Sequence, residues 1–195
     1  LVCNASVADL RAKPRQGPGN YDNDDMRESQ ILYNEVLLPV SRRSGWFHVE
    51  ATEQKRYVAG IGWTGYSGWV AAGTVFPVRT VPECNFTVRA PVAPIFADPS
   101  KNRRPLALIS MGTRFASTGD TAEGGKLLEV RLARGGAAWI ERAQVERRGL
   151  REEEESLRQG LVAAATKFVG SPYLWGGRSM YMPEASLGSR SSLLS

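Results

Sequence analysis

The hydrophobic positions of this chain fall in short runs where apolar and polar residues alternate. One series of runs occupies residues 6–14, 28–40, 45–51 and 65–75, and a second series occupies 87–99, 106–118 and 127–146. Glycine, proline, asparagine and aspartate separate the runs. Alternation with a period of two is typical of strands with one buried face, and short strands without helices between them predict small β-barrels.

The two series share features that predict a repeat. Trp69 and Trp139 are each followed by an aliphatic residue near the end of a series, and Cys-Asn pairs begin at Cys3 and Cys84, near the start of each. The matched cysteines leave two alternatives open, a Cys3–Cys84 disulfide and two free thiols.

This repeat predicts one small β domain over residues 1–80 and another over 81–148, each near the lower size limit for an independent hydrophobic core. Much of the first core is expected to come from large aromatic side chains. These are Trp46, Phe47, Trp63, Tyr66 and Trp69.

Residues 151–170 have a different pattern, which predicts an α-helix. Leu157, Leu161, Ala165 and Phe168 recur at spacings of four, four and three, so they share one helix face. Glutamates near the start favour a helix N-terminus, and Gly170 is a natural stop. The apolar face implies that something beyond the two β domains packs against it.

Composition and charge narrow the possible partners. The 195 residues carry a formal net charge of +5, with 42% hydrophobic and 23% charged residues, which is typical of a globular protein. No apolar run is long enough for a membrane span, and no signal-peptide pattern precedes the first expected strand. The basic residues are scattered, so nucleic acid is not an expected partner. Without a CxxC motif or a Cys/His cluster, no metal or cofactor is expected.

Several motifs of the first series resemble bacterial SH3 domains. They are Val-x-x-Leu-Arg-x-x-Pro at 7–14, Glu-Ser-Gln-x-Leu-x-x-Glu at 28–35, Gly-Trp at 45–46 and Gly-Tyr-x-Gly-Trp-Val at 65–70. The second series resembles the same fold more loosely, through Ala-Asp-Pro at 97–99 and Gly-Thr at 112–113. The resemblance implies two SH3-like barrels.

After the expected helix, Gly-Ser-Pro-Tyr-Leu-Trp-Gly-Gly at 170–177 is similar to the start of the NlpC/P60 cysteine peptidase domain. The whole arrangement resembles the dipeptidyl-peptidase VI type, which cuts between γ-D-glutamate and a diamino acid in cell-wall peptides with a free N-terminal L-alanine. The resemblance implies a mainly β chain, in which two small SH3-like β-barrels precede the first helix and turn of an α+β, papain-like domain. Residues 149–195 are assigned to the N-terminal fragment of that domain.

The catalytic motif of that family is absent from this sequence. No Asp-Cys-Ser-Gly follows residue 182, the cysteines lie at Cys3 and Cys84, and the single histidine, His48, belongs to an expected strand. A thiolate nucleophile needs a base within hydrogen-bond reach, so we expect no catalytic residue in this chain and no hydrolysis by it. Truncation, a shifted reading frame and a pseudo-enzyme are the explanations that stay open.

The resemblance also implies residues that bind the peptide. In this family the first SH3-like unit holds the substrate's ammonium group with a carboxylate and a tyrosine. The matches here are Glu28 and Tyr66, with Glu35 as a weaker alternative to Glu28. Tyr173 matches the tyrosine beside the nucleophile, and Trp175 belongs to the same turn. The structural alternatives are a solvated carboxylate at Glu28, barrel packing at Tyr66 and a turn-shaping role for Trp175.

Three functions follow as hypotheses. The chain is the front part of a cell-wall peptide hydrolase, a non-catalytic module that binds cell-wall peptides or a protein, or a scaffold fragment whose helix face docks another chain. The peptide-based functions are compatible with a secreted or envelope protein after signal removal, and alternatively with muropeptide recycling in the cytoplasm.

Overall fold

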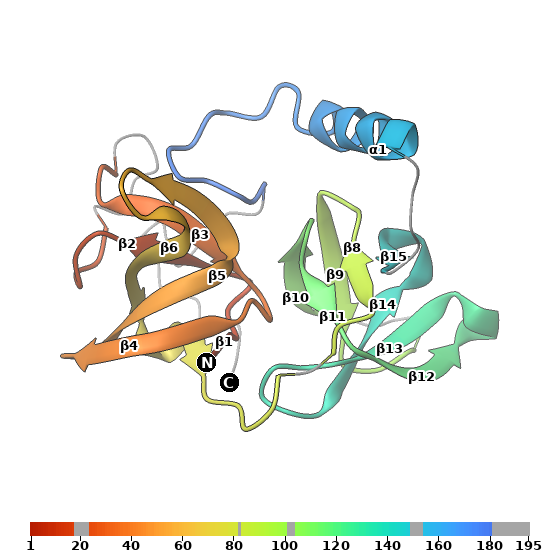
Figure 1. The fold of residues 1–195 in the computed structure, drawn as a ribbon. Helices are drawn as coiled ribbons and strands as arrows, with labels where there is room; N and C mark the ends of the chain where they lie inside the picture. Colours follow the sequence, from red (N-terminus) through yellow and green to blue (C-terminus); the bar gives the residue numbers. More distant parts are fainter. Residues whose placement is uncertain (18–23, 82, 101–103, 149–153, 181–195) are drawn as a thin grey trace.

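The computed structural model describes residues 1–17, 24–81, 83–100, 104–148 and 154–180. Within them the protein is mainly β, as the alternating pattern predicts, with antiparallel sheets followed by one α-helix (Figure 1). We call residues 1–76 the first β unit and residues 86–147 the second β unit. The SH3 type of these units and the domain boundaries at 80 and 148 stay predictions.

The first β unit contains a five-stranded antiparallel sheet in the order β3-β2-β6-β5-β4. Its strands are β2 (Val7–Arg11), β3 (Arg27–Leu32), β4 (Leu37–Arg43), β5 (Trp46–Val58) and β6 (Gly62–Ala71). Two short strands, β1 (Val2–Cys3) and β7 (Val75–Phe76), pair with each other, and a 3-10 turn at Ala72–Thr74 precedes β7. Ser44 and Gly45 both have positive φ, which suits the tight turn of the β4–β5 hairpin.

The second β unit contains two antiparallel sheets. The larger has the order β10-β9-β14-β13-β12, and the smaller has the order β11-β8-β15. Their strands are β8 (Phe86–Val88), β9 (Val92–Phe96), β10 (Pro105–Ser110), β11 (Arg114–Phe115), β12 (Ser117–Ala122), β13 (Leu127–Arg131), β14 (Ala137–Glu141) and β15 (Val145–Arg147). Short 3-10 turns at Glu123–Gly125 and Arg142–Gln144 connect strands within this unit.

The core of the first β unit is aliphatic. Its fully buried members include Leu10, Ile31, Leu37 and Val49. The expectation of an aromatic core is wrong for Trp63, whose side chain is 72% exposed, while the other four aromatic residues are only partly buried. The reason is geometric. Beyond residue 51, β5 pairs with β6 alone, so no further strand covers this part of the hairpin.

The core of the second β unit is completed by two residues of the first. Val2 and Tyr33 pack in the same buried cluster as Ile109 and Phe115. The Tyr33 ring lies 5.8 Å from the Phe115 ring, and its hydroxyl oxygen accepts a hydrogen bond from the backbone N–H of Ala133 at 3.0 Å. The two units therefore share buried apolar surface.

The expected helix is present as α1 (Glu154–Thr166). The helix ends at Thr166, before the expected stop at Gly170, which has a φ of +85°, so Phe168 lies beyond α1; residues 151–153 lie outside the described part. The apolar face is not covered within the described part of the protein, because Leu157 is exposed and Leu161 is 70% exposed. Lys167 attaches the helix end to the second β unit by donating to the carbonyl oxygen of Arg89 at 2.9 Å.

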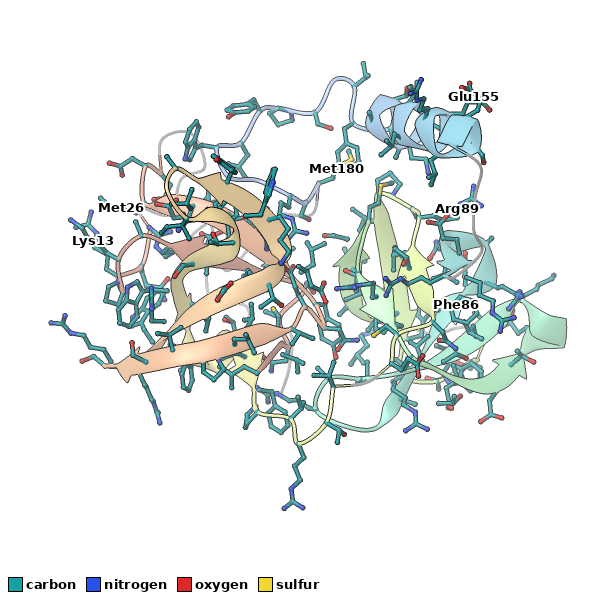
Figure 2. All side chains as sticks on the ribbon, in the orientation of Figure 1. Lys13, Met26, Phe86, Arg89, Glu155 and Met180 are labelled. Carbon is teal, nitrogen blue, oxygen red and sulfur yellow. The ribbon has the colours of Figure 1, made fainter. Side chains whose placement is uncertain are left out.

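After the helix the chain crosses to the first β unit, along the blue segment in Figure 1. Met180, the last described residue, is labelled in Figure 2, where all described side chains are drawn. None of the helices in the described part of the chain has the length and apolarity that crossing a membrane requires.

Candidate functional site

A buried polar network lies along β3, one of the two edge strands of the first sheet. Gln54 of β5 donates through Nε2 to the carbonyl oxygen of Gln30 at 3.0 Å and to Oε1 of Glu35 at 2.6 Å. Its own Oε1 accepts from the Ser29 hydroxyl at 2.6 Å, and the Leu32 N–H donates to Oε2 of Glu35 at 3.0 Å. Because each buried polar group finds a partner, the network fixes the position of β3 relative to β5.

Residues 171–179, which we call the C-terminal turn, lie against this network. The backbone N–H of Arg178 donates to Oε1 of Gln30 at 2.9 Å. Its Nη1 donates to the Gln30 carbonyl oxygen at 2.9 Å and to Oε2 of Glu35 at 2.8 Å. The carboxylate of Glu35 is 4% exposed, so this ion pair is largely shielded from water.

Glycine allows the C-terminal turn to approach β3 closely. The Gly177 N–H donates to the Leu174 carbonyl at 2.9 Å, and Gly176 has a φ of +67°. A Cβ at Gly176 would lie 3.1 Å from the Arg27 oxygen and 3.2 Å from the backbone of Glu28. A side chain here would therefore be both strained and crowded.

The C-terminal turn also touches the second β unit. The hydroxyl of Ser179 is hydrogen-bonded to the hydroxyl of Ser110, a buried residue at the end of β10. The carbonyl oxygen of Trp175 lies 3.5 Å from Nη1 of Arg27 on the first unit. The turn thus contacts both units within five residues.

The expected substrate-binding residues lie on different elements and differ in burial. Glu28 lies half-buried on β3, directly beneath the C-terminal turn, whereas Tyr66 lies on β6, where the Arg56 guanidinium stacks 5.2 Å above its ring. Within the described residues no hydrogen bond joins Glu28 to Tyr66. The side chain of Tyr173 is 84% exposed and that of Trp175 is 60% exposed, so neither packs in a core. Their roles stay predictions.

A second buried group of charges supports β3 from the side of β2. Asp24 accepts from Nη1 and Nη2 of Arg11 at 2.6 and 2.9 Å, and Arg27 donates through Nε to Asp9 at 2.9 Å. The hydrogen bond from Arg11 lowers the pKa of Asp24 below its usual value, against the opposing effect of burial.

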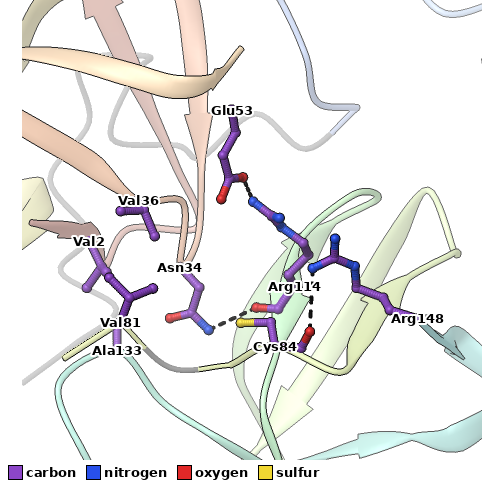
Figure 3. A pocket seen from close by; sticks show the side chains of 9 residues that line it. All are labelled: Val2, Asn34, Val36, Glu53, Val81, Cys84, Arg114, Ala133 and Arg148. Carbon is purple, nitrogen blue, oxygen red and sulfur yellow. Dashed lines mark hydrogen bonds and ion pairs between the residues drawn. The ribbon is translucent and has the colours of Figure 1, made fainter. Parts of the chain in front are cut away.

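A pocket of about 150 Å³ lies between the two β units (Figure 3). Its lining comprises Val2, Asn34, Val36, Glu53, Val81, Cys84, Arg114, Ala133 and Arg148. Asn34 donates to the carbonyl oxygen of Arg114 at 3.0 Å, Glu53 pairs with the Arg114 guanidinium, and Arg148 donates to the Cys84 carbonyl at 3.4 Å. Burial lowers the pKa of Arg114, and the like charge of Arg148 acts in the same direction.

The two thiols and the imidazole each have their own surroundings in the fold. Cys3 and Cys84 are not in a disulfide, so the free-thiol alternative holds in this structure. Burial raises the pKa of both thiols, that of Cys3 to about 12, which disfavours the reactive thiolate. His48 lies on β5, with Nε2 3.2 Å from the Ser67 hydroxyl and its ring 5.0 Å from that of Trp69. Among the described residues, no group of three or more His, Cys, Asp or Glu side chains is arranged to hold a metal ion.

Comparison with solved structures identifies a similar fold. No family model and no curated protein matches this sequence. The crystal structure of an NlpC/P60 family protein from Bacillus cereus matches with a TM-score of 0.72 and 19% sequence identity. The two proteins share a fold. The match covers 92% of this chain and 66% of the Bacillus cereus chain, so this chain spans about two thirds of that protein's length.

A second solved structure, NlpC2 from Trichomonas vaginalis, matches with a TM-score of 0.26 and 11% identity over 72% of this chain and 47% of that one, which is too weak to support an argument.

Of the residues that hold the C-terminal turn, the sequence singled out Glu35 alone, as a weaker alternative to Glu28 for binding substrate, whereas the structure pairs its carboxylate with Arg178. Gln30 and Glu35 lie inside the Glu-Ser-Gln motif at 28–35, which gave a signal for the strand but not for its partners. Gln54 and Arg178 lie 24 and 148 residues from Gln30, and polar residues of this kind carry no periodic signal.

Proposed function

We propose that this chain is the peptide-binding front part of an NlpC/P60-type cell-wall peptide hydrolase. The fold shared with the Bacillus cereus protein supports the general type. The docking of the C-terminal turn on the strand that carries Glu28 is the observation that supports a peptide site at this position.

The proposed ligand is a cell-wall peptide with a free N-terminal L-alanine. Glu28 is half-buried beside Gly176, and within the described residues its carboxylate makes no hydrogen bond or ion pair. An ammonium group is a fitting partner for such a carboxylate, because the hydrogen bond is charge-assisted. Tyr173 and Trp175 are exposed in the C-terminal turn and offer aromatic surface to the rest of the peptide. Tyr66 remains the proposed phenolic partner.

The proposal includes binding without turnover by this 195-residue chain. Its imidazole is packed on Trp69, and its thiols have raised pKa values. The second candidate, a non-catalytic binding module, rests on the same observation. Incubation with the peptide, followed by chromatography, tests the absence of turnover that both candidates share, because release of the diamino acid would contradict it.

Calorimetry with L-Ala-γ-D-Glu-diamino acid peptide tests the site. We expect Glu28→Gln to weaken binding by about tenfold, the loss typical of one charge-assisted hydrogen bond, and N-acetylation of the peptide to have a similar effect. Glu146→Gln is the matched control, because Glu146 is exposed on β15 of the second β unit. Equal affinity of the free and acetylated peptides would contradict the proposal.

A further inference from the structure

Arg178 makes the most extensive polar contacts of the C-terminal turn. Its backbone N–H and its Nη1 together form three hydrogen bonds, two to Gln30 and one to Glu35. The side chain of Arg178 is 35% exposed, whereas Glu35 and Gln30 are buried. The turn is therefore attached to the first β unit at a point where the receiving groups are already fixed.

The buried carboxylate of Glu35 requires a cation. A carboxylate out of water is costly unless it is paired and hydrogen-bonded. Arg114 also faces the small hollow beside Glu35, but its guanidinium is paired with Glu53. Among the described residues, Arg178 is the cation in ion-pair contact with Glu35.

These contacts set the register of the C-terminal turn on β3. Arg178 is bonded at Gln30, and two residues earlier Gly176 abuts the backbone of Glu28. The two contacts are two residues apart both in the turn and on β3, so a shift of the turn along the strand would break both. The aromatic side chains of Tyr173 and Trp175 are exposed and contribute little burial, so polar contacts carry the attachment.

We propose that Arg178 is a positioning residue for the peptide site. By bonding to Glu35 and Gln30, it holds the C-terminal turn over Glu28, so that the turn and the carboxylate face one ligand. This inference rests on the proposed function, because the ligand is the peptide proposed there. Arg178 itself touches no part of the ligand, and its effect on affinity is indirect.

The chemistry of the contact gives a graded pair of variants. A single nitrogen, Nη1, makes both side-chain hydrogen bonds. A lysine ammonium has three donors and serves both acceptors, so Arg178→Lys keeps the ion pair with Glu35 and the hydrogen bond to the Gln30 carbonyl. Methionine has similar length without charge or donors. Arg178→Met leaves the Glu35 carboxylate without its ion pair, so Arg178→Met with Glu35→Gln is added to remove that buried charge while the side-chain bonds of residue 178 stay absent and its backbone bond to Gln30 is kept.

Two measurements on the full chain test the inference. Hydrogen exchange reports the order of the C-terminal turn at the amides of Gly177 and Arg178, which donate to Leu174 and Gln30. Calorimetry reports the affinity for the L-Ala-γ-D-Glu-diamino acid peptide. For Arg178→Met, and for its double variant with Glu35→Gln, we expect exchange about tenfold faster and affinity about tenfold weaker, and for Arg178→Lys values near those of the native chain. Arg43→Met, on the exposed edge strand β4, is the charge-matched control.

Each outcome bears on the inference. Faster exchange and weaker binding in Arg178→Met, both rescued in Arg178→Lys, support it. If Glu28→Gln alone and the double variant Glu28→Gln with Arg178→Met lose nearly the same affinity, that result supports the action of Arg178 through Glu28. Unchanged exchange in Arg178→Met overturns the attachment. Faster exchange with unchanged affinity overturns the positioning role and leaves a structural contact. Absence of peptide binding by the native chain overturns the proposed function and the positioning role together, and the exchange data distinguish that case from failure of the attachment.

Discussion

The carboxylate of Asp24 is almost fully buried, and it accepts two hydrogen bonds from Arg11 while Arg27 lies 3.6 Å away. Its backbone neighbour Met26 also donates to it at 3.2 Å. Because Arg11 holds the pKa of Asp24 below its ordinary value, the charged form belongs to the folded state. This one side chain therefore links the stability of the first β unit to pH.

We expect Asp24→Asn to lower the free energy of unfolding by about 1.5–3 kcal/mol at pH 7, because the buried Arg11 loses its two hydrogen bonds to a charged carboxylate and keeps only its 3.3 Å contact with Asp9. The stabilisation is present above the unfolded-state pKa of about 3.9 and is lost as the pH falls through the lower folded-state pKa. Urea unfolding at pH 7 and pH 3 measures both effects, and the exposed neighbour Asp25 provides the control variant Asp25→Asn. A pH-independent difference between Asp24→Asn and the native chain would contradict this assignment.

Sequence reasoning at the residue scale was limited to motifs. The Leu-Arg-x-x-Pro match drew attention to Arg11 as part of a family pattern, but nothing in the chain indicated its pairing with Asp24, 13 residues away. The possible Cys3–Cys84 disulfide was suggested by matched sequence context alone, and in the structure Cys3 instead packs in the first core. Similar local sequence does not specify which side chains meet in space.

At the scale of elements, periodicity was the reliable signal. The alternating runs became strands, and the spacing of Leu157, Leu161 and Ala165 correctly predicted α1, although Phe168, expected on the same face, lies beyond the helix end at Thr166. Burial was harder to infer, because it depends on which element covers a face. Trp63 follows the strand pattern, yet it lies on the part of the β5–β6 hairpin that no third strand covers. The helix pattern likewise predicted the apolar face of α1 but not its exposure.

The exposed helix face leads to a prediction about stability. We expect Leu161→Ser to change the free energy of unfolding by less than about 0.5 kcal/mol, because an exposed side chain loses little on truncation. Leu10→Ala, at a fully buried position of the first core, is expected to cost about 2–5 kcal/mol. Urea titration of the two variants makes the comparison. A cost for Leu161→Ser as large as that for Leu10→Ala would show that the helix face is covered in solution.

At the scale of the whole molecule, the two β units are joined through their interiors. Tyr33 of the first unit packs on Phe115 and accepts a hydrogen bond from Ala133, 100 residues along the chain. Asn34 donates a further hydrogen bond between the units, to the backbone carbonyl of Arg114, and the C-terminal turn contacts both units. No local pattern predicts such contacts, because each depends on the final docking of two sheets. The repeat in the sequence indicated two similar series but not their shared core.

We expect Tyr33→Phe to lower the free energy of unfolding by about 1–3 kcal/mol, because the buried N–H of Ala133 loses its acceptor. Since the cores are joined, we also expect near-ultraviolet and far-ultraviolet circular dichroism of the native chain to report one thermal transition. Tyr57→Phe is the matched control, because Tyr57 is exposed on the β5–β6 hairpin. Two separate transitions in the native chain, with no effect of Tyr33→Phe, would contradict this coupling.

The placement of Val2 and Tyr33 has a consequence for how such a protein can change over generations. A repeat of two similar units looks like a pair of interchangeable parts, which recombination is free to copy or exchange. Here the second unit depends on side chains of the first unit, so its sequence alone would carry an unfilled apolar surface into a new protein. Selection is therefore expected to retain the two units as an inherited pair.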